Sequence, residues 1–185
     1  MINEEIINYA KSLENLHIAR WEDLPDFDLY ATQVVDFNKK ELFFLEIFGE
    51  NFVTKSMLNN YVKNKMVPKP FNKKYKKDSL AMFITITLLK QIFELADIKK
   101  GMDMQIKNLG SIDFAYNTFI QEFEGGIDKI FNEMINNELS EVTLMKNVQK
   151  PIMITHLATE ALVAKLLVKK VIDTGGFQLN GENYE

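Results

Sequence analysis

Apolar side chains recur at helical spacing along most of the chain, which predicts a mainly helical protein. The first stripe falls within residues 3–16, a helix that Asn3 would cap. A second helix is predicted from about Leu29 to Phe48, with Gly49 as a suitable stop. Between them, Trp21 to Asp28 contains a proline and three aspartates, residues that suit a connection.

The middle of the chain predicts two helices around a lysine-rich loop. Thr54 is a good N-cap for a first helix that reaches Lys65, and Pro68 and Pro70 end it. The loop 71–77 follows. A longer apolar helix, capped by Asp78 or Ser79, is then predicted to run to about Phe93, and residues 96–107 predict one more short helix.

The last third of the chain also predicts helices. Residues 111–134 keep helical spacing but contain Gly125-Gly126, which favours either one kinked helix or two helices. Residues 138–150 have no clear pattern, and a final helix is predicted for about 152–174. That helix is apolar around most of its circumference, which is typical of a bundle centre or a dimer interface. The sequence leaves a homodimer and a small-molecule effector pocket both open.

Charge is unevenly distributed along the chain. Residues 55–77 contain eight lysines and no carboxylate, whereas the remainder of the chain has 14 basic and 26 acidic residues. The segment is therefore about +8 on a body of about −12. Such a local inversion of charge is typical of a nucleic-acid-binding surface.

The side chains of this segment suit DNA. Asparagine pairs with adenine edges, while lysine and serine contact phosphates or guanine. On the predicted helix, the outward positions are Lys55, Ser56, Asn59, Asn60, Lys63 and Asn64. In the following segment, the residues predicted to contact phosphates are Lys69, Lys73, Lys74, Tyr75, Lys76 and Lys77. The alternative for both sets is a surface that is merely well solvated.

Sequence motifs for catalysis and metal binding are missing. The chain has no cysteine, and His17 and His156 are far apart in sequence and outside metal-ligand spacings. There is no glycine-rich phosphate loop. Paired carboxylates such as Glu122 and Glu124 lie in hydrophilic stretches, where solvation explains them. We therefore expect no enzyme activity, no cofactor and no metal.

Targeting patterns are missing as well. The N-terminal residues lack the basic and apolar regions of a signal peptide. The longest apolar run, Leu80 to Leu89, is about half of what a membrane span needs. We expect a cytoplasmic protein with no membrane partner.

The segment 54–99 resembles the winged helix-turn-helix of MerR-like regulators. The matching places are Asn60-Tyr61, Met66-Val67-Pro68, Tyr75 and Leu95 to Ile98. Asn60 replaces the arginine of the family's Arg-Tyr pair, and the chain lacks the long coiled-coil helix and cysteine metal sensor of well-known members. The resemblance adds Tyr61 to the candidate DNA-binding residues, whereas helical spacing places Leu58, Tyr61 or Val62, and Met66 on the buried stripe of the same helix.

A second resemblance covers most of the chain. From LPDFDLYATQVVDF (24–37) to ITHLATEALVAKLL (154–167), the sequence resembles a bacterial domain-of-unknown-function family, number eighteen thirty-six. That resemblance implies a MerR-like domain.

Together these observations predict a mainly all-α protein with a MerR-like winged helix-turn-helix and a small β wing, followed by a C-terminal helical region. The predicted divisions are an N-terminal helix (1–23), the winged-helix domain (24–108), a dimerisation or effector region (109–176) and a flexible tail (177–185). The predicted function is transcriptional regulation, as a homodimer on double-stranded DNA. The alternative is a protein-interaction module that binds an acidic partner through the same basic face.

Overall fold

The protein is mainly helical, as the sequence predicts. The computed structural model describes residues 4–135 and 149–175. Its helices are α1 (Glu4–Ser12), α2 (Ala31–Glu41), α3 (Lys55–Lys63), α4 (Lys77–Leu89), α5 (Leu95–Leu109), α6 (Ile112–Ile135) and α7 (Met153–Asp173). Turns of 3-10 helix are formed by Trp21–Asp23, Phe43–Phe48 and Lys150–Ile152, and the strands β1 (Leu29–Tyr30) and β2 (Lys74–Tyr75) pair antiparallel.

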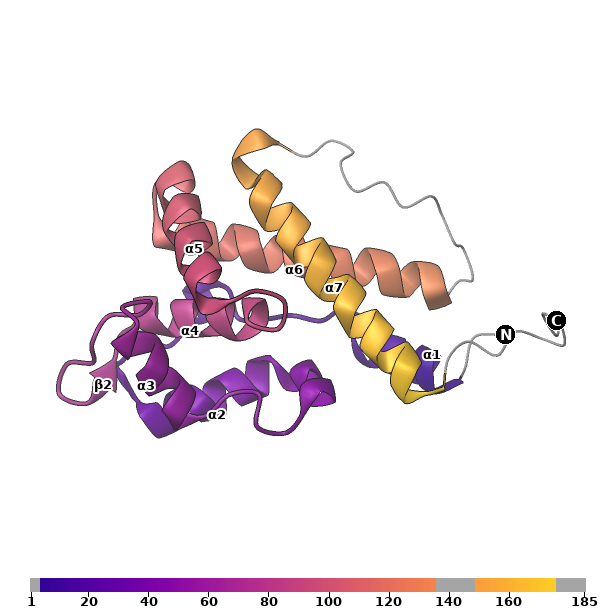
Figure 1. Ribbon diagram of the computed structural model, residues 1–185, viewed down its shortest axis with the longest axis horizontal. Coiled ribbons are helices and arrows are strands. Elements are labelled where there is room, and N and C mark those ends of the chain that lie inside the picture. Colours follow the sequence, from indigo (N-terminus) through magenta and orange to yellow (C-terminus); the bar gives the residue numbers. More distant parts are fainter. Residues whose placement is uncertain (1–3, 136–148, 176–185) are drawn as a thin grey trace, which may run out of the picture.

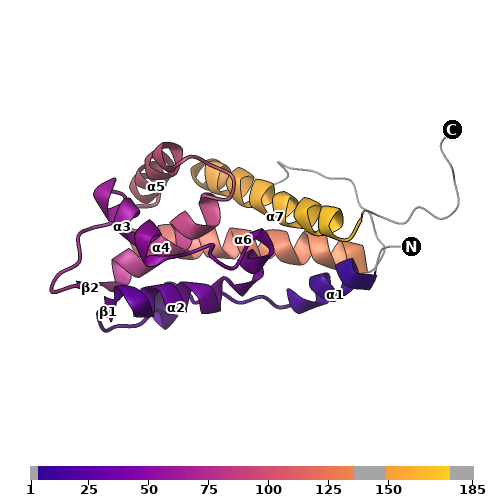
Figure 2. The same cartoon turned by 60° about the horizontal axis from the view of Figure 1, so that its bottom comes forward.

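The elements form two groups joined by α4. In Figures 1 and 2, α7 packs on α6, and α1 lies at the end of this pair that is farthest from the small sheet. The small sheet, α2 and α3 lie at the opposite end of the molecule. The candidate DNA-binding segment is thus well separated from α1 and from the end of α7.

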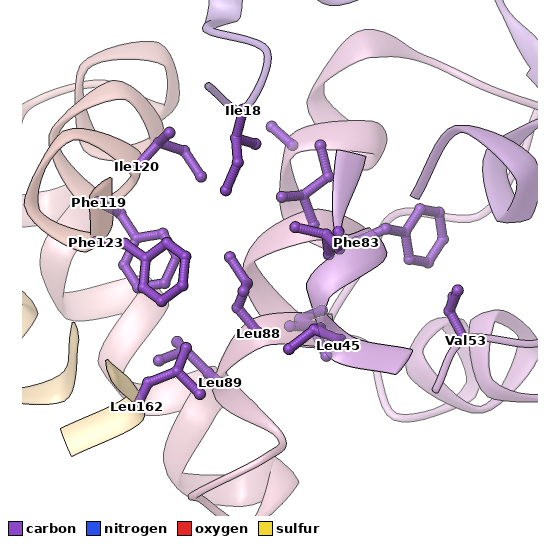
Figure 3. Close-up of a cluster of buried hydrophobic side chains, with 14 of the residues drawn as sticks. Ile18, Leu45, Val53, Phe83, Leu88, Leu89, Phe119, Ile120, Phe123 and Leu162 are labelled. Atoms are coloured by element: carbon purple, nitrogen blue, oxygen red, sulfur yellow. The ribbon is translucent and has the colours of Figure 1, made fainter. Parts of the chain in front are cut away.

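Helix α4 is the centre of the hydrophobic core. Ten of its thirteen residues are buried, so it contacts other elements on nearly every side. Figure 3 shows Phe83 extending on the side of Val53, while Leu88 and Leu89 extend toward Phe119 and Phe123 of α6. One helix therefore supports both groups.

The predicted helix 29–48 is wrong as a single element. Leu29 and Tyr30 form β1, because they pair with Tyr75 and Lys74 of β2. Helix α2 ends at Glu41, and a 3-10 segment follows until Gly49, which is at φ +116° and ends it as predicted. Leu42, Phe44 and Leu45 are all buried. An α-helix would place Leu42 and Phe44 on nearly opposite sides, so the chain turns more tightly here and buries all three residues.

Other helix ends differ by a few residues. Asn15 and Lys65 have positive φ, so α1 stops at Ser12 rather than residue 16, and α3 stops at Lys63. Helix α4 begins at Lys77, earlier than predicted, because β2 leads almost directly into it. It ends at Leu89, and α5 spans 95–109, longer than predicted. Asn3, residues 138–148 and the tail 177–185 lie outside the described residues.

Helix α7 is long and apolar enough, by length and composition, to cross a membrane. About a third of the most apolar stretch of this helix is buried within the protein, where α7 packs on α6. Leu162, Val163 and Leu166 are fully buried in this contact. The helix is less enclosed than α4, and its outer side is exposed.

Residues 112–135 form one helix, α6, with Gly125-Gly126 inside it. Gly126 is buried against α7, and a Cβ atom there would lie 3.3 Å from Val163 Cγ2. A Cβ atom on exposed Gly125 would meet nothing within 4 Å. Gly126 therefore permits close helix packing, whereas Gly125 has no such role.

This difference predicts opposite outcomes for two neighbouring substitutions. Gly125→Ala should raise the free energy of unfolding by about 0.5–1 kcal/mol, because alanine favours the helix. The unfolding free energy of Gly126→Ala should be at least about 1 kcal/mol lower than that of Gly125→Ala, because the added methyl group crowds Val163. Urea denaturation of both variants measures this, and equal effects would contradict the packing role of Gly126.

Candidate nucleic-acid interface

A tight hairpin forms the outer part of the candidate site. The Phe71 N–H donates to the Lys74 carbonyl (3.0 Å), and the Lys74 N–H donates to the Phe71 carbonyl (2.9 Å). Asn72 (φ +48°) and Lys73 (φ +66°) are the two residues between them. A two-residue loop with two positive φ values is typical of a type I′ turn, which fits the twist of antiparallel strands. Lys73 therefore lies at the hairpin tip.

The hairpin has a buried face and an exposed face. Lys74 is opposite both Tyr30 and Phe71, so these three side chains lie on one side of the strands. Lys74 Nζ lies 4.9 Å from the centroid of the Tyr30 ring, and Phe71 is 69% exposed. The exposed face thus combines aromatic rings with lysine.

Helix α3 packs on Phe83 of α4, as does Tyr75 of the hairpin, and it presents the predicted polar face. Its N-cap is confirmed, because the Met57 N–H donates to Thr54 Oγ1 (3.3 Å). Leu58, on the inner side of the helix, is buried. All six predicted outward residues are exposed: Lys55, Ser56, Asn59, Asn60, Lys63 and Asn64.

Both candidate tyrosines belong to the core. Tyr61 and Tyr75 are 2% and 4% exposed, so neither side chain reaches the surface. Their rings pack on Phe83 of α4, with centroid separations of 6.4 and 5.1 Å. Burial also raises the pKa of Tyr61 to about 12. They position α3 and β2, and we leave them out of the candidate contact surface.

The lysines of the segment differ in their surroundings. Lys77 is half-buried, and its Nζ lies 2.7 Å from Asp26 Oδ1, so its charge is balanced within the protein. Lys74 is half-buried beside Tyr30. The remaining lysines are exposed, and we define the lysine face as Lys55, Lys63, Lys65, Lys69, Lys73 and Lys76 together with Lys74.

The two central asparagines are not equivalent. The Asn64 side-chain amide donates to the Asn60 carbonyl (2.9 Å) and to Asn60 Oδ1 (3.0 Å). This uses one of the two lone pairs of Asn60 Oδ1. Within the described part of the chain, Asn59 makes no side-chain hydrogen bond. Asn59 is therefore better placed to use both its donor and its acceptor on a ligand.

Lys90, which the sequence did not single out, holds the start of α3. Lys90 directly follows the last residue of α4. Its ammonium group donates to the Phe52 carbonyl and to Met57 Sδ, the latter at 3.1 Å. Burial lowers the pKa of Lys90 to about 8. Periodicity gave no indication of this contact, because it joins residues more than thirty positions apart.

The candidate acid–base carboxylates have structural partners instead. Glu124 is buried and accepts from the Ile18 N–H (2.7 Å) and from the guanidinium of Arg20. Glu122 Oε2 lies 2.7 Å from Nδ1 of His156. Among the described residues, no three His, Asp or Glu side chains gather as a metal site would require.

The comparisons with known proteins give one match. A family model described as Domain of unknown function (DUF1836) matches residues 19–123, more than half of the chain. The matched range includes the hairpin, α3 and the whole lysine face. No curated protein and no solved structure matches the chain.

The lowered pKa of Lys90 predicts a pH dependence of stability. Between about pH 8 and pH 10.5 the lysine is charged in the unfolded chain and largely neutral in the folded protein. The unfolded state then binds more protons, so stability rises with pH. From pH 7 to 9.5 we expect a gain of about 1 kcal/mol, after allowing for partial solvent screening.

Urea denaturation at several pH values measures this gain in the unfolding free energy. Lys90→Met should lose it, while Lys40→Met, at an exposed position of α2, should keep it. The same rise in Lys90→Met would contradict the assignment.

Proposed function

The chain belongs to the DUF1836 family, and we propose that it is a DNA-binding transcriptional regulator. The proposal assigns α2 and α3 to a MerR-like helix-turn-helix and the hairpin to its wing. The observation that carries it is the lysine face, which is exposed beside an asparagine-bearing helix surface and contains no carboxylate within residues 55–77.

Helix α3 has the properties of a recognition helix. One side, with Leu58 and Tyr61, is fixed in the core, while the other carries amide and hydroxyl side chains together with Lys55 and Lys63. In the major groove, asparagine discriminates adenine through paired hydrogen bonds. We assign base contacts to Asn59 first and to Ser56, Asn60 and Lys63 around it.

The hairpin suits the phosphate backbone. Lys73 at the tip and Lys76 after β2 are exposed, and neither forms an ion pair with a carboxylate among the described residues. Lysines on a rigid turn supply the sequence-independent part of DNA binding. Lys74 and Phe71 extend this surface along the outer face of the strands.

An acidic protein partner would use the same lysines but has less need of the amides. Exposed asparagine presents a donor and an acceptor side by side, an arrangement that matches a base edge. The carboxylate side chains of an acidic partner offer acceptors alone. The row of amides on α3 therefore favours DNA over an acidic protein.

We also propose that the regulator is a homodimer that pairs through α7. The exposed side of α7 carries Ala161, Ala164, Val168 and Ile172, spaced three and four residues apart. Val168 and Ile172 are 56% and 68% exposed. This spacing is that of a helix-pairing seam, and two copies of the same stripe complement each other about a two-fold axis.

Fluorescence anisotropy with labelled duplex DNA tests the proposed function. DNA from around the protein's own gene should bind tightly, resist unrelated competitor DNA and weaken steeply with salt. Weak binding that is equal on all sequences, or retention by an acidic protein rather than DNA, would overturn it.

The hairpin assignment predicts the salt dependence of a double variant. Lys73→Gln with Lys76→Gln should lower the slope of log K against log salt by about 2, because two phosphate contacts are lost. The matched control is Lys107→Gln with Lys129→Gln, two exposed lysines on α5 and α6, which should leave the slope unchanged. An unchanged slope in the hairpin variant would remove the hairpin from the interface.

In the same assay, Asn59→Ala separates base recognition from charge. It should reduce the preference for the specific site while keeping the salt slope, since it removes base contacts and no charge. Equal weakening on all sequences would contradict a role for Asn59 in base recognition.

The seam on α7 predicts the mass in solution. Sedimentation equilibrium should give twice the 21.5 kDa chain mass for the wild type, and Val168→Lys with Ile172→Lys should give a monomer. The control Lys11→Gln, on α1, should remain dimeric. A wild type that sediments as a monomer at micromolar concentration would contradict the homodimer.

A further inference from the structure

The outer face of the hairpin carries an uncovered phenyl ring. Phe71 is the most exposed large apolar side chain in the described part of the chain, at 69%. Its backbone N–H and carbonyl are both bonded to Lys74, so the main chain that carries the ring is fixed by the turn. Among the described residues its ring forms no aromatic pair and no cation–π contact, whereas the Tyr30 ring has Lys74 Nζ at 4.9 Å.

The charged groups nearest to Phe71 in the hairpin are all cationic. Lys69 and Lys73 are exposed and lie two positions away on either side of it, and Lys74 is its partner across the turn. Residues 55–77 contain no carboxylate. Because an exposed ring gains free energy when water is removed from it, a partner is favoured that sets a flat apolar surface beside anionic groups.

Nucleic acids have this combination in every unit, because each nucleotide has a flat base and a phosphate. In an acidic protein, a ring and a charge belong to separate residues. In a DNA duplex, however, neighbouring bases cover each other, so a side chain reaches a base face only where a base step opens. Apolar wedges that open such steps enter from the minor groove, which adjoins the major groove assigned to α3.

We propose that Phe71 inserts at an opened base step of the bound DNA and stacks on a base, while Lys69 and Lys73 pair with nearby phosphates. This inference rests on the proposed function and adds a second source of specificity. The DNA site should contain a step that opens easily, such as TA or CA, where the hairpin lies. Tyr30 is less suited to insertion, since Lys74 lies against its ring.

The test uses the full-length protein and two short labelled duplexes of the same sequence, one fully paired and one with a central T·T mismatch. A mismatched step is already partly unstacked, so less free energy is lost when the ring enters. The wild type should bind the mismatched duplex about 5-fold more tightly, as expected for one base–aromatic stack. Fluorescence anisotropy measures both affinities.

Substitutions of Phe71 separate stacking from charge. Phe71→Ala should bind the two duplexes equally and keep the salt slope, because no charge is lost. The matched control is Phe114→Ala on α6, which removes another exposed phenyl ring (56%) and should keep the 5-fold preference. The preference compares two DNAs on one variant, so a general loosening of the structure does not mimic the result.

Tryptophan fluorescence provides an independent arm. Trp21→Phe removes the single tryptophan of the chain, and in this background Phe71→Trp reports stacking directly, since a base stacked on indole quenches its emission. The mismatched duplex should quench this variant and should leave Phe114→Trp unquenched. Circular dichroism shows whether each variant folds.

The outcomes separate this inference from the proposed function. Binding to neither duplex would overturn both. Equal binding of the wild type to the two duplexes, without quenching of Phe71→Trp, would overturn the insertion alone and leave DNA binding in place. A preference that persists in Phe71→Ala would also overturn it. Quenching by poly-glutamate and not by DNA would assign the hairpin face to an acidic protein instead.

Discussion

The packing of two tyrosines on Phe83 is the contact on which the candidate interface depends. Phe83 is fully buried in α4, and it receives Tyr61 from α3 and Tyr75 from β2. Because both elements rest on the same ring, the exposed surface of α3 and the hairpin are held in one fixed relation. The lysines around them can then form a single surface, although they come from separate elements.

Helix α4 extends this role through the protein. Near its first turns it supports α3 and the hairpin, and along the rest of its length it contacts α6 and contributes Met82, Thr85 and Leu89 to a cavity between α4, α5, α6 and α7. Lys90, just after its end, returns to the segment that enters α3. A helix buried on nearly every side is therefore the common support of the proposed DNA-binding surface and of the helices that enclose the cavity.

Local sequence patterns predicted much of the candidate interface. The Thr54 cap, the exposed face of α3 and the lysine-rich turn follow from short-range rules of capping, periodicity and charge, which need no knowledge of the remaining chain. The mainly helical fold was predictable for the same reason. The DUF1836 match supports the family that the sequence resembled.

Long-range contacts were beyond these patterns. Tyr75 appeared suited to phosphate contact from its place in the lysine-rich loop, and Tyr61 became a candidate through the resemblance, but both are buried against Phe83. The ion pair of Lys77 with Asp26 and the pairing that turns Leu29 and Tyr30 into a strand each join residues more than forty positions apart. The cavity requires four helices at once. Each of these features arises from tertiary packing, which overrides local preference.

The most direct test of the central claim is amide hydrogen exchange of the full-length protein with and without its specific duplex DNA. If the lysine face binds DNA, exchange should be slower in α3 and in the hairpin 71–76, with α1 and the outer residues of α5 unchanged. Unchanged exchange in α3 and the hairpin, with protection confined to other helices, would show that the lysine face is not the DNA-binding surface.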